Sequence, residues 1–87
     1  MNQHTRRWAV VPDAQLRLRY WDEECVLYHG SSGDTHRLPE LVGRLLEHLL
    51  VAPATLFELS EAINLHEEDV ATALGDLARL GITEPVT

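Results

Sequence analysis

The sequence predicts an α+β fold in which a three-stranded antiparallel meander is followed by three helices. Residues 16–38 hold short runs of strand-favouring residues separated by turn-forming stretches. From Pro39 onward, apolar residues recur at helical spacing instead. Because the meander and each helix have one apolar face, all four can share a single core. We expect an N-terminal segment over residues 1–14 and one domain over residues 15–84.

The predicted strands cover residues 16–21, 25–29 and 35–38. The acids at positions 22–24 suit a hairpin turn. The stretch GSSGD at 30–34 suits a second turn, since glycine and serine accept the backbone angles that tight turns need. Connections this short make neighbouring strands antiparallel.

The first predicted strand has two different faces. Apolar and polar side chains alternate along it, in the order Leu16, Arg17, Leu18, Arg19, Tyr20, Trp21. Trp21 therefore points away from the apolar side chains and lies on the side of the two arginines. Two interpretations stay open: the indole is covered by the N-terminal segment beside Trp8, or it belongs to an exposed binding surface.

The first two helices have recognisable ends. Pro39 suits the first position of a helix, and Ala52-Pro53 ends that helix. Its apolar face consists of Leu41, Val42, Leu45, Leu46, Leu49 and Leu50. The second helix starts after Thr55, because Thr55 and Glu58 have the spacing of a capping box.

The third helix is expected to begin at Asn64 or His66. Its apolar stripe consists of Val70, Ala73, Leu74, Leu77 and Leu80. Gly81 can adopt the left-handed conformation that follows a helix, and Ile82 can make the accompanying apolar contact. The tail EPVT is expected to fray.

Composition indicates a cytoplasmic protein. The chain has 87 residues, which is enough for one domain with a modest core. No apolar run approaches the ~20 residues that span a bilayer, and no apolar block follows the two N-terminal arginines as a secretory signal would. The single cysteine, Cys25, excludes an internal disulfide and fits a reducing compartment. We expect no membrane partner.

The charge distribution argues against nucleic-acid binding. Tightly joined second and third helices are typical of a helix-turn-helix, whose second helix reads DNA. However, the net charge is −7, and after Pro53 the one base, Arg79, faces seven acids. These acids are Glu58, Glu61, Glu67, Glu68, Asp69, Asp76 and Glu84. Since cations on phosphates provide most nucleic-acid affinity, we expect no nucleic-acid partner. A winged helix-turn-helix regulator that binds DNA is kept as the alternative function.

The sequence gives little support for catalysis. It contains no phosphate-binding glycine loop, metalloprotease motif or nucleophile elbow. His29, His36 and Cys25 could meet in space, but their spacing matches no metal-ligand pattern, and polar strand residues are the simpler interpretation. Cys25 has no evident base beside it to make it a nucleophile. We therefore expect no enzyme, no catalytic residue, no metal and no cofactor.

Several strings resemble one family of peptide-binding proteins. They are YWDEECVLY followed by SGDTHRL, then PELVGRLLEHLL, TLFEL and DVATALGDLARLGI. Over residues 8–83, their order resembles the PqqD-like proteins, the leader-peptide recognition domains also called RiPP recognition elements. The combination of WDEE with SGDTHRL is most similar to the PqqD-type peptide chaperones found with kinases related to HPr kinase. Pro39, the Ala52-Pro53 turn and the short connection before the third helix depart from the PqqD proteins of the quinone-cofactor pathway.

The resemblance implies a winged helix-turn-helix fold that no longer binds DNA. Such domains capture the leader of a precursor peptide as an extra strand on their third strand, against their third helix. Carried over to this chain, the strand residues are Thr35, His36, Arg37 and Leu38. The groove wall is Val70, Ala73, Leu74 and Leu77, of which Ala73 and Val70 are expected at the exposed shoulder of the helix.

The residues of the third predicted strand and third helix also favour peptide capture on physical grounds. An unpaired strand edge offers N–H and C=O groups to any extended peptide, and pockets at alternate positions add selectivity. The acids at 67–69 suit the helix N-terminus, and we expect them to favour a basic leader while Arg37 favours an acid. The predicted function is a non-catalytic chaperone that presents the leader of a precursor peptide to a modifying enzyme. A homodimer through the same edge stays open.

Overall fold

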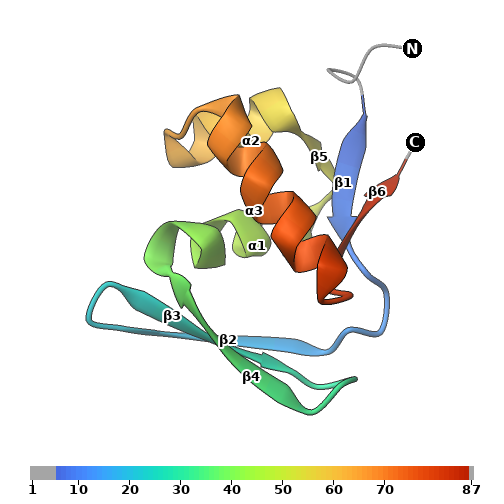
Figure 1. The fold of residues 1–87 in the computed structure, drawn as a ribbon. Coiled ribbons are helices and arrows are strands. Elements are labelled where there is room, and N and C mark those ends of the chain that lie inside the picture. The colour runs from blue at the N-terminus through green and yellow to red at the C-terminus, as the bar shows by residue number, and fades with distance from the viewer. Residues whose placement is uncertain (1–5, 87) are drawn as a thin grey trace.

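The computed structural model describes residues 6–86 and confirms the α+β class (Figure 1). Three helices accompany two antiparallel three-stranded sheets, with strand orders β2-β3-β4 and β5-β1-β6. The strands are β1 (Arg7–Val10), β2 (Leu16–Trp21), β3 (Glu24–His29), β4 (Asp34–Pro39), β5 (Ala54–Thr55) and β6 (Thr83–Val86). The helices are α1 (Glu40–Val51), α2 (Leu56–Ile63) and α3 (Glu67–Arg79). The helices lie on one side of the β2-β3-β4 sheet, and the smaller sheet flanks them (Figure 1).

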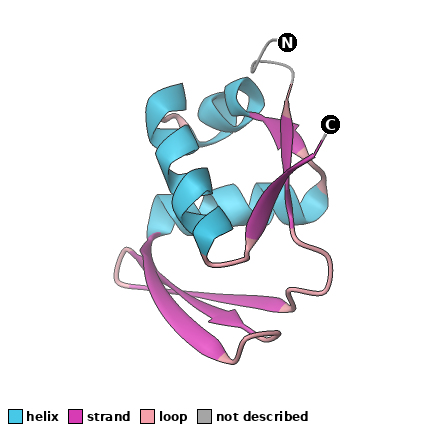
Figure 2. Cartoon of the chain, turned by 45° about the vertical axis from the view of Figure 1, so that its right-hand side comes forward, coloured by secondary structure: helices cyan, strands magenta, loops and turns pink. Residues whose placement is uncertain are grey.

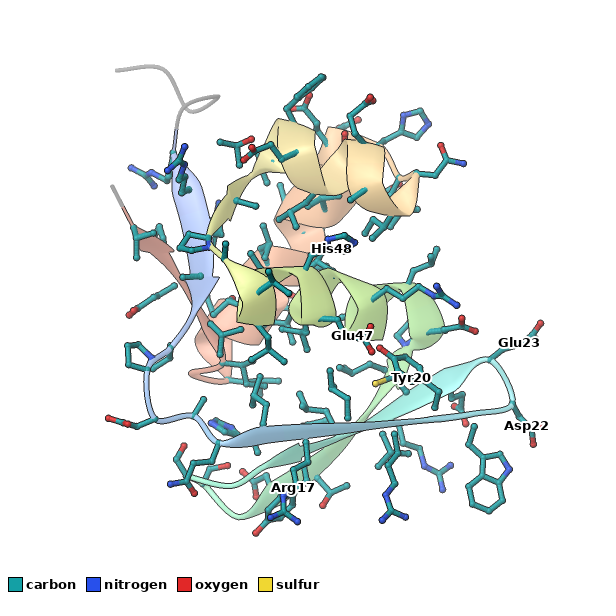
Figure 3. All side chains as sticks on the ribbon, turned by 180° about the vertical axis from the view of Figure 1, so that it is seen from behind. Arg17, Tyr20, Asp22, Glu23, Glu47 and His48 are labelled. Carbon is teal, nitrogen blue, oxygen red and sulfur yellow. The ribbon has the colours of Figure 1, made fainter. Side chains whose placement is uncertain are left out.

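The β2-β3-β4 sheet has one covered and one open face. Its central strand β3 alternates strictly, with Cys25, Leu27 and His29 buried and Glu24 and Tyr28 exposed. This alternation follows from the pleat, which sends successive side chains to opposite faces. α1 lies across the covered face (Figure 3).

The hairpin between β2 and β3 is one residue tighter than the sequence predicted. Glu24 pairs with Trp21 and starts β3, so the turn consists of Asp22 and Glu23 alone. Both residues have positive φ angles, 50° and 63°. This combination matches the right-handed twist of the flanking strands, although glycine or asparagine usually supplies it.

The β5-β1-β6 sheet was not predicted. Val10 of β1 pairs with Thr83 of β6, and Trp8 pairs with Ala54 of β5. The prediction that EPVT frays is therefore wrong for residues 84–86, while Thr87 lies outside the described residues. The Thr83 hydroxyl donates a 2.9 Å hydrogen bond to the Leu74 carbonyl and ties β6 to α3.

The local signals at the helix ends are confirmed, with one small difference. Thr55 caps α2 in a complete capping box with Glu58. His66 occupies the N-cap position of α3 without a capping hydrogen bond from its side chain. Asn64 closes α2 in the left-handed conformation, at φ 58°. Pro39 is the N-cap of α1 rather than its first helical residue.

The end of α3 is a Schellman motif. Gly81 has a φ of 78°, its N–H donates to the Ala78 carbonyl, and the Ile82 N–H donates to the Leu77 carbonyl over 3.0 Å. This pair of bonds satisfies carbonyls that a helix end otherwise leaves open. Ile82 is fully buried beyond the turn, which fixes the direction in which β6 leaves α3.

One apolar core joins the sheets and the helices. Its buried members are Leu27, Leu45, Leu46, Leu49, Leu59, Ile63, Val70, Leu74, Leu77 and Ile82. α1 approaches β3 so closely at Gly43 that a Cβ there would lie 2.6 Å from the Cys25 Sγ. Within residues 6–86, no helix has both the length and the apolar character needed to cross a bilayer.

Candidate functional site

The backbone of β4 has a side that faces away from its partner strand. The Glu40 N–H donates to the Glu23 carbonyl over 3.2 Å. Glu23 and Glu40 are the next pair after Glu24 and Pro39 in the β3–β4 register, so this pair is a hydrogen-bonded one. Antiparallel pairs alternate between bonded and non-bonded, so His36 and Leu38 bond to β3. The N–H and C=O groups of Thr35 and Arg37 consequently point outward.

The other hairpin supports this assignment. The Gly30 N–H donates to the Gln15 carbonyl over 3.0 Å, at the end of the β2-β3 register. The same alternation then directs the backbone groups of Val26 and Tyr28 toward β2, and those of Cys25, Leu27 and His29 toward β4. Both hairpins therefore agree on which residues of β3 form hydrogen bonds with β4.

The outward side of β4 is an open edge. β4 is the last strand in the order β2-β3-β4, and among residues 6–86 no strand pairs with it on that side. The opposite edge is β2, which runs across the front in the view of Figure 3, with α1 above it. The edge of β4 instead lies on the side of α3, whose C-terminal end comes down beside the sheet (Figure 2). The two edges therefore have different neighbours.

A groove of about 310 Å³ lies between the end of β4, the start of α1 and one side of α3. Its lining residues are Leu38, Pro39, Val42, Asp69, Thr72, Ala73, Asp76, Leu77 and Leu80. The volume is at the lower limit for small-molecule pockets, and most of the lining residues are apolar. Such a groove suits one or two apolar side chains better than a cofactor.

The predicted strand residues divide between two faces. Leu38 lines the groove. His36 points to the covered face, where its Nε2 is buried and has no hydrogen-bond partner among the described residues. Thr35 and Arg37 have exposed side chains on the open face, so their contribution to an edge would come from the backbone.

The predicted helix residues also divide. Ala73 and Leu77 line the groove. Val70 and Leu74 are fully buried and do not line it, so the expectation that Val70 lies at the exposed shoulder is wrong. Val70 and Leu74 instead belong to the core that holds α3 in place.

Sequence reasoning missed several groove residues on α3. Asp69, Thr72, Asp76 and Leu80 lie three or four positions apart along the helix and share one side with Ala73. A helical projection centred on Ala73 could have found them. Leu80 is 44% exposed and contributes an apolar side chain to the lining at the C-terminal end of α3.

The rim of the groove is acidic. Asp76 is paired with Arg79 within α3, and both side chains are largely exposed. Asp69 lies in the first turn of α3 together with Glu67 and Glu68. The positive end of the helix dipole stabilises carboxylates in this turn. The groove thus combines an apolar floor with negative charge at one end.

The residues considered for a metal site or a nucleophile do not form such a site among residues 6–86. Burial, followed by the charge of Glu47, raises the pKa of the Cys25 thiol, and the side chain is fully buried. The Nε2 of His29 lies 2.9 Å from the Ser31 hydroxyl. Over the described part of the chain, no group of three or more histidine, cysteine, aspartate or glutamate side chains could hold a metal ion.

No family model, curated protein or solved structure matches the chain. The resemblance to the PqqD-like proteins therefore depends on the residue strings and the element order given above.

Proposed function

We propose that the protein is a non-catalytic peptide chaperone with a winged helix-turn-helix-like fold, similar to the PqqD-like proteins. It binds the leader of a precursor peptide as an extra strand on β4 and presents it to a modifying enzyme. The observation that carries the proposal is the open edge at Thr35 and Arg37 beside an apolar groove. β-strand addition uses both features together, the edge for affinity and the groove for selectivity.

Neither feature is sufficient alone. Each backbone hydrogen bond to the peptide contributes about 0.5–1.5 kcal/mol net. Burial of one large apolar side chain contributes about 1.5–3 kcal/mol. A micromolar complex needs about 8 kcal/mol after the cost of association. The ligand must therefore pair with the edge and also place an apolar anchor between Leu38 and Ala73.

The geometry also predicts which side chains of the bound peptide face the groove. Alternate side chains of an added strand point to opposite faces, so every second residue would face α3. An apolar residue there enters the groove, and a basic residue two positions away, on the same face of the peptide, can approach Asp69 at the rim. The expectation that Arg37 selects an acid is compatible, because its exposed side chain lies on the other face.

A pair of variants at Thr35 tests the proposal. Synthetic leaders of precursor peptides encoded near this protein are titrated while the backbone amide signals of residues 6–86 are followed by NMR. Thr35→Pro removes an outward N–H, which an edge strand tolerates, and should weaken binding about tenfold by loss of one hydrogen bond. Thr35→Val retains the N–H and the branched shape and should bind as the wild type does. His36→Pro is unsuitable, since it removes an inward N–H that holds β4 to β3.

The same experiment can reject the proposal. If no peptide shifts the amides of residues 35–38 and of α3, peptide capture at this edge is wrong. Light scattering that shows a dimer at high concentration, lost in Thr35→Pro, would assign the edge to self-association. A salt-sensitive complex with duplex DNA would instead revive the regulator alternative.

A further inference from the structure

The open face of the β2-β3-β4 sheet has an unusual composition for this acidic protein. Three of the seven arginines and one of the fourteen acids lie on it, which leaves four arginines against thirteen acids elsewhere. Its residues form three rows across the strands: Arg17, Tyr28 and Thr35; Arg19, Val26 and Arg37; Trp21, Glu24 and Pro39. The face is therefore a basic and aromatic patch on a negatively charged molecule.

The arginines of this patch have no partner among residues 6–86. No hydrogen bond or ion pair holds the guanidinium groups of Arg17, Arg19 and Arg37 to any residue between 6 and 86. The usual strand spacing puts Arg19 and Arg37 about 10 Å apart, on either side of Val26. Figure 3 shows Arg17 pointing away from the helices. Clustered like charges without a counter-ion weaken the fold slightly, so stability does not explain them.

Protection of the sheet edges does not explain the patch either. Charged side chains on edge strands do prevent unwanted strand pairing. Trp21, however, is 75% exposed in the same patch, and Tyr28 is 43% exposed beside Arg17. A solvent-exposed indole increases the risk of aggregation, so this patch does not serve to prevent it. Arginine, tryptophan and tyrosine together are the residues most enriched where proteins bind other proteins.

We infer that the open face of this sheet is a docking surface for an acidic surface of another protein. Complementary charge is the reason for choosing this partner. Carboxylates on the partner would pair with three free guanidinium groups, while the negative remainder of the molecule would orient the approach. A second copy of this chain fits less well, because symmetric pairing of the two faces would bring arginines against arginines.

Nucleic acid is the less favoured occupant. Aromatic and basic residues on an open sheet can stack bases. Affinity for nucleic acid, however, increases with the number of phosphates contacted, and the net charge of −7 repels a polyanion at long range. The inference does not depend on peptide capture, since the open face exists without an added strand.

The test uses three probes of equal length with the full-length protein. The first is a short, capped peptide in which leucines interrupt a run of glutamates. The second replaces each glutamate with lysine, and the third is an oligothymidylate. Binding is followed by tryptophan fluorescence, to which both Trp8 and Trp21 contribute, and by amide shifts in β2, β3 and β4. The acidic peptide should bind, more weakly as salt increases, and the lysine peptide should not.

Matched variants distinguish the effect of the patch on binding from the effect of net charge. Arg19→Gln combined with Arg37→Gln should weaken binding of the acidic peptide about tenfold. Arg7→Gln combined with Arg79→Gln removes the same charge elsewhere and should leave affinity within about twofold. Trp21→Ala should also weaken binding, whereas Phe57→Ala, which removes an exposed ring on α2, should not. Circular dichroism checks that each variant folds.

Four results would overturn the inference. One is absence of amide shifts on the open face, and another is equal loss of affinity in both arginine pairs. The third is oligothymidylate binding that equals or exceeds that of the acidic peptide, which would assign the face to nucleic acid. The fourth is binding lost in Thr35→Pro but retained when Arg19 and Arg37 are replaced. In that case the probe lies along β4, and peptide capture stands without the second surface.

Discussion

The two faces of the β2-β3-β4 sheet use the same backbone for opposite purposes. On the covered face, Cys25 and Leu27 have no exposed surface and pack beneath α1. On the open face, Trp21 and Tyr28 lie beside arginines in solvent. Residues adjacent in sequence thus differ completely in burial, because the pleat sends them to opposite sides and the helices cover only one. The covered face stabilises the fold, and the open face is available for recognition.

The difference between the faces also fixes the strand register. A shift of one residue in β3 would move Leu27 into solvent and Tyr28 toward α1. A buried face makes such a shift costly, so the register is well specified. The positions of the outward groups at Thr35 and Arg37 follow from this register. The stability of one face consequently determines what the edge offers to a ligand.

The largest expected effect comes from neighbouring substitutions on the two faces. Leu27→Ala should lower the free energy of unfolding by about 2–5 kcal/mol, because it leaves a cavity in a fully buried site. Val26→Ala, on the open face, should cost less than about 1 kcal/mol. Urea denaturation of both variants measures the contrast. Similar losses at both positions would mean that the open face is covered in solution.

A second contrast uses two helical glycines. Gly43→Ala would place a Cβ 2.6 Å from the Cys25 Sγ and 2.9 Å from the Tyr20 ring, and should cost about 1–3 kcal/mol. Gly75→Ala meets no atom within 4 Å, so its higher helix propensity should stabilise the protein by about 1 kcal/mol. Opposite signs in urea denaturation are expected.

The role of the thiol is tested by combining Gly43→Ala with Cys25→Ala. Removal of the Sγ relieves the shortest contact, so the second substitution should cost less in the Gly43→Ala background than in the wild type. Additive costs would show that α1 does not approach β3 as closely as the structure places it.

The parts of the fold that the sequence predicted depend on short-range chemistry. The capping box at Thr55 and the left-handed Gly81 each involve residues within one helical turn, so they are visible in the sequence. The predicted turn of the β2-β3 hairpin was one residue too long, because Asp22 is followed by Glu23 and not by the glycine that usually completes a two-residue turn.

The second sheet was missed because its pairing is long-range. β5 has only two residues, and β6 contains Pro85, which normally argues against a strand. Pro85 is tolerated because β6 is an edge strand that pairs only with β1. The pairing of Val10 with Thr83 depends on how α3 ends and where β6 then leaves it. No local pattern contains that information.

The candidate site was predicted only in part for a related reason. Val70, Ala73, Leu74 and Leu77 form one apolar stripe, and helical periodicity treats them alike. α3 packs against α2 and β6, and in this packing Val70 and Leu74 are buried while Ala73 lies at the groove. The boundary between core and groove depends on neighbouring elements, which the periodicity does not reveal.

The smallest expected effect compares two tyrosines on opposite faces. The Tyr20 hydroxyl donates a hydrogen bond to Glu47 of α1, whose side chain lies next to it in Figure 3. The Tyr28 hydroxyl has no partner among residues 6–86. Tyr20→Phe should therefore cost about 0.5 kcal/mol at neutral pH, at the low end for a hydrogen bond, because the site is 43% exposed. Tyr28→Phe should be close to neutral.

The contribution of Tyr20 should also depend on pH. Burial, and then the hydrogen bond to the Glu47 carboxylate, raise the pKa of Tyr20 above its ordinary value of about 10. A group whose pKa is raised in the folded state stabilises the protein fully below its unfolded pKa, and this stabilisation is lost as the pH rises above it. The difference in unfolding free energy between the wild type and Tyr20→Phe should therefore shrink above about pH 10. Other alkaline effects are common to both proteins and cancel in the difference, so a constant gap would show that the hydroxyl does not contact Glu47.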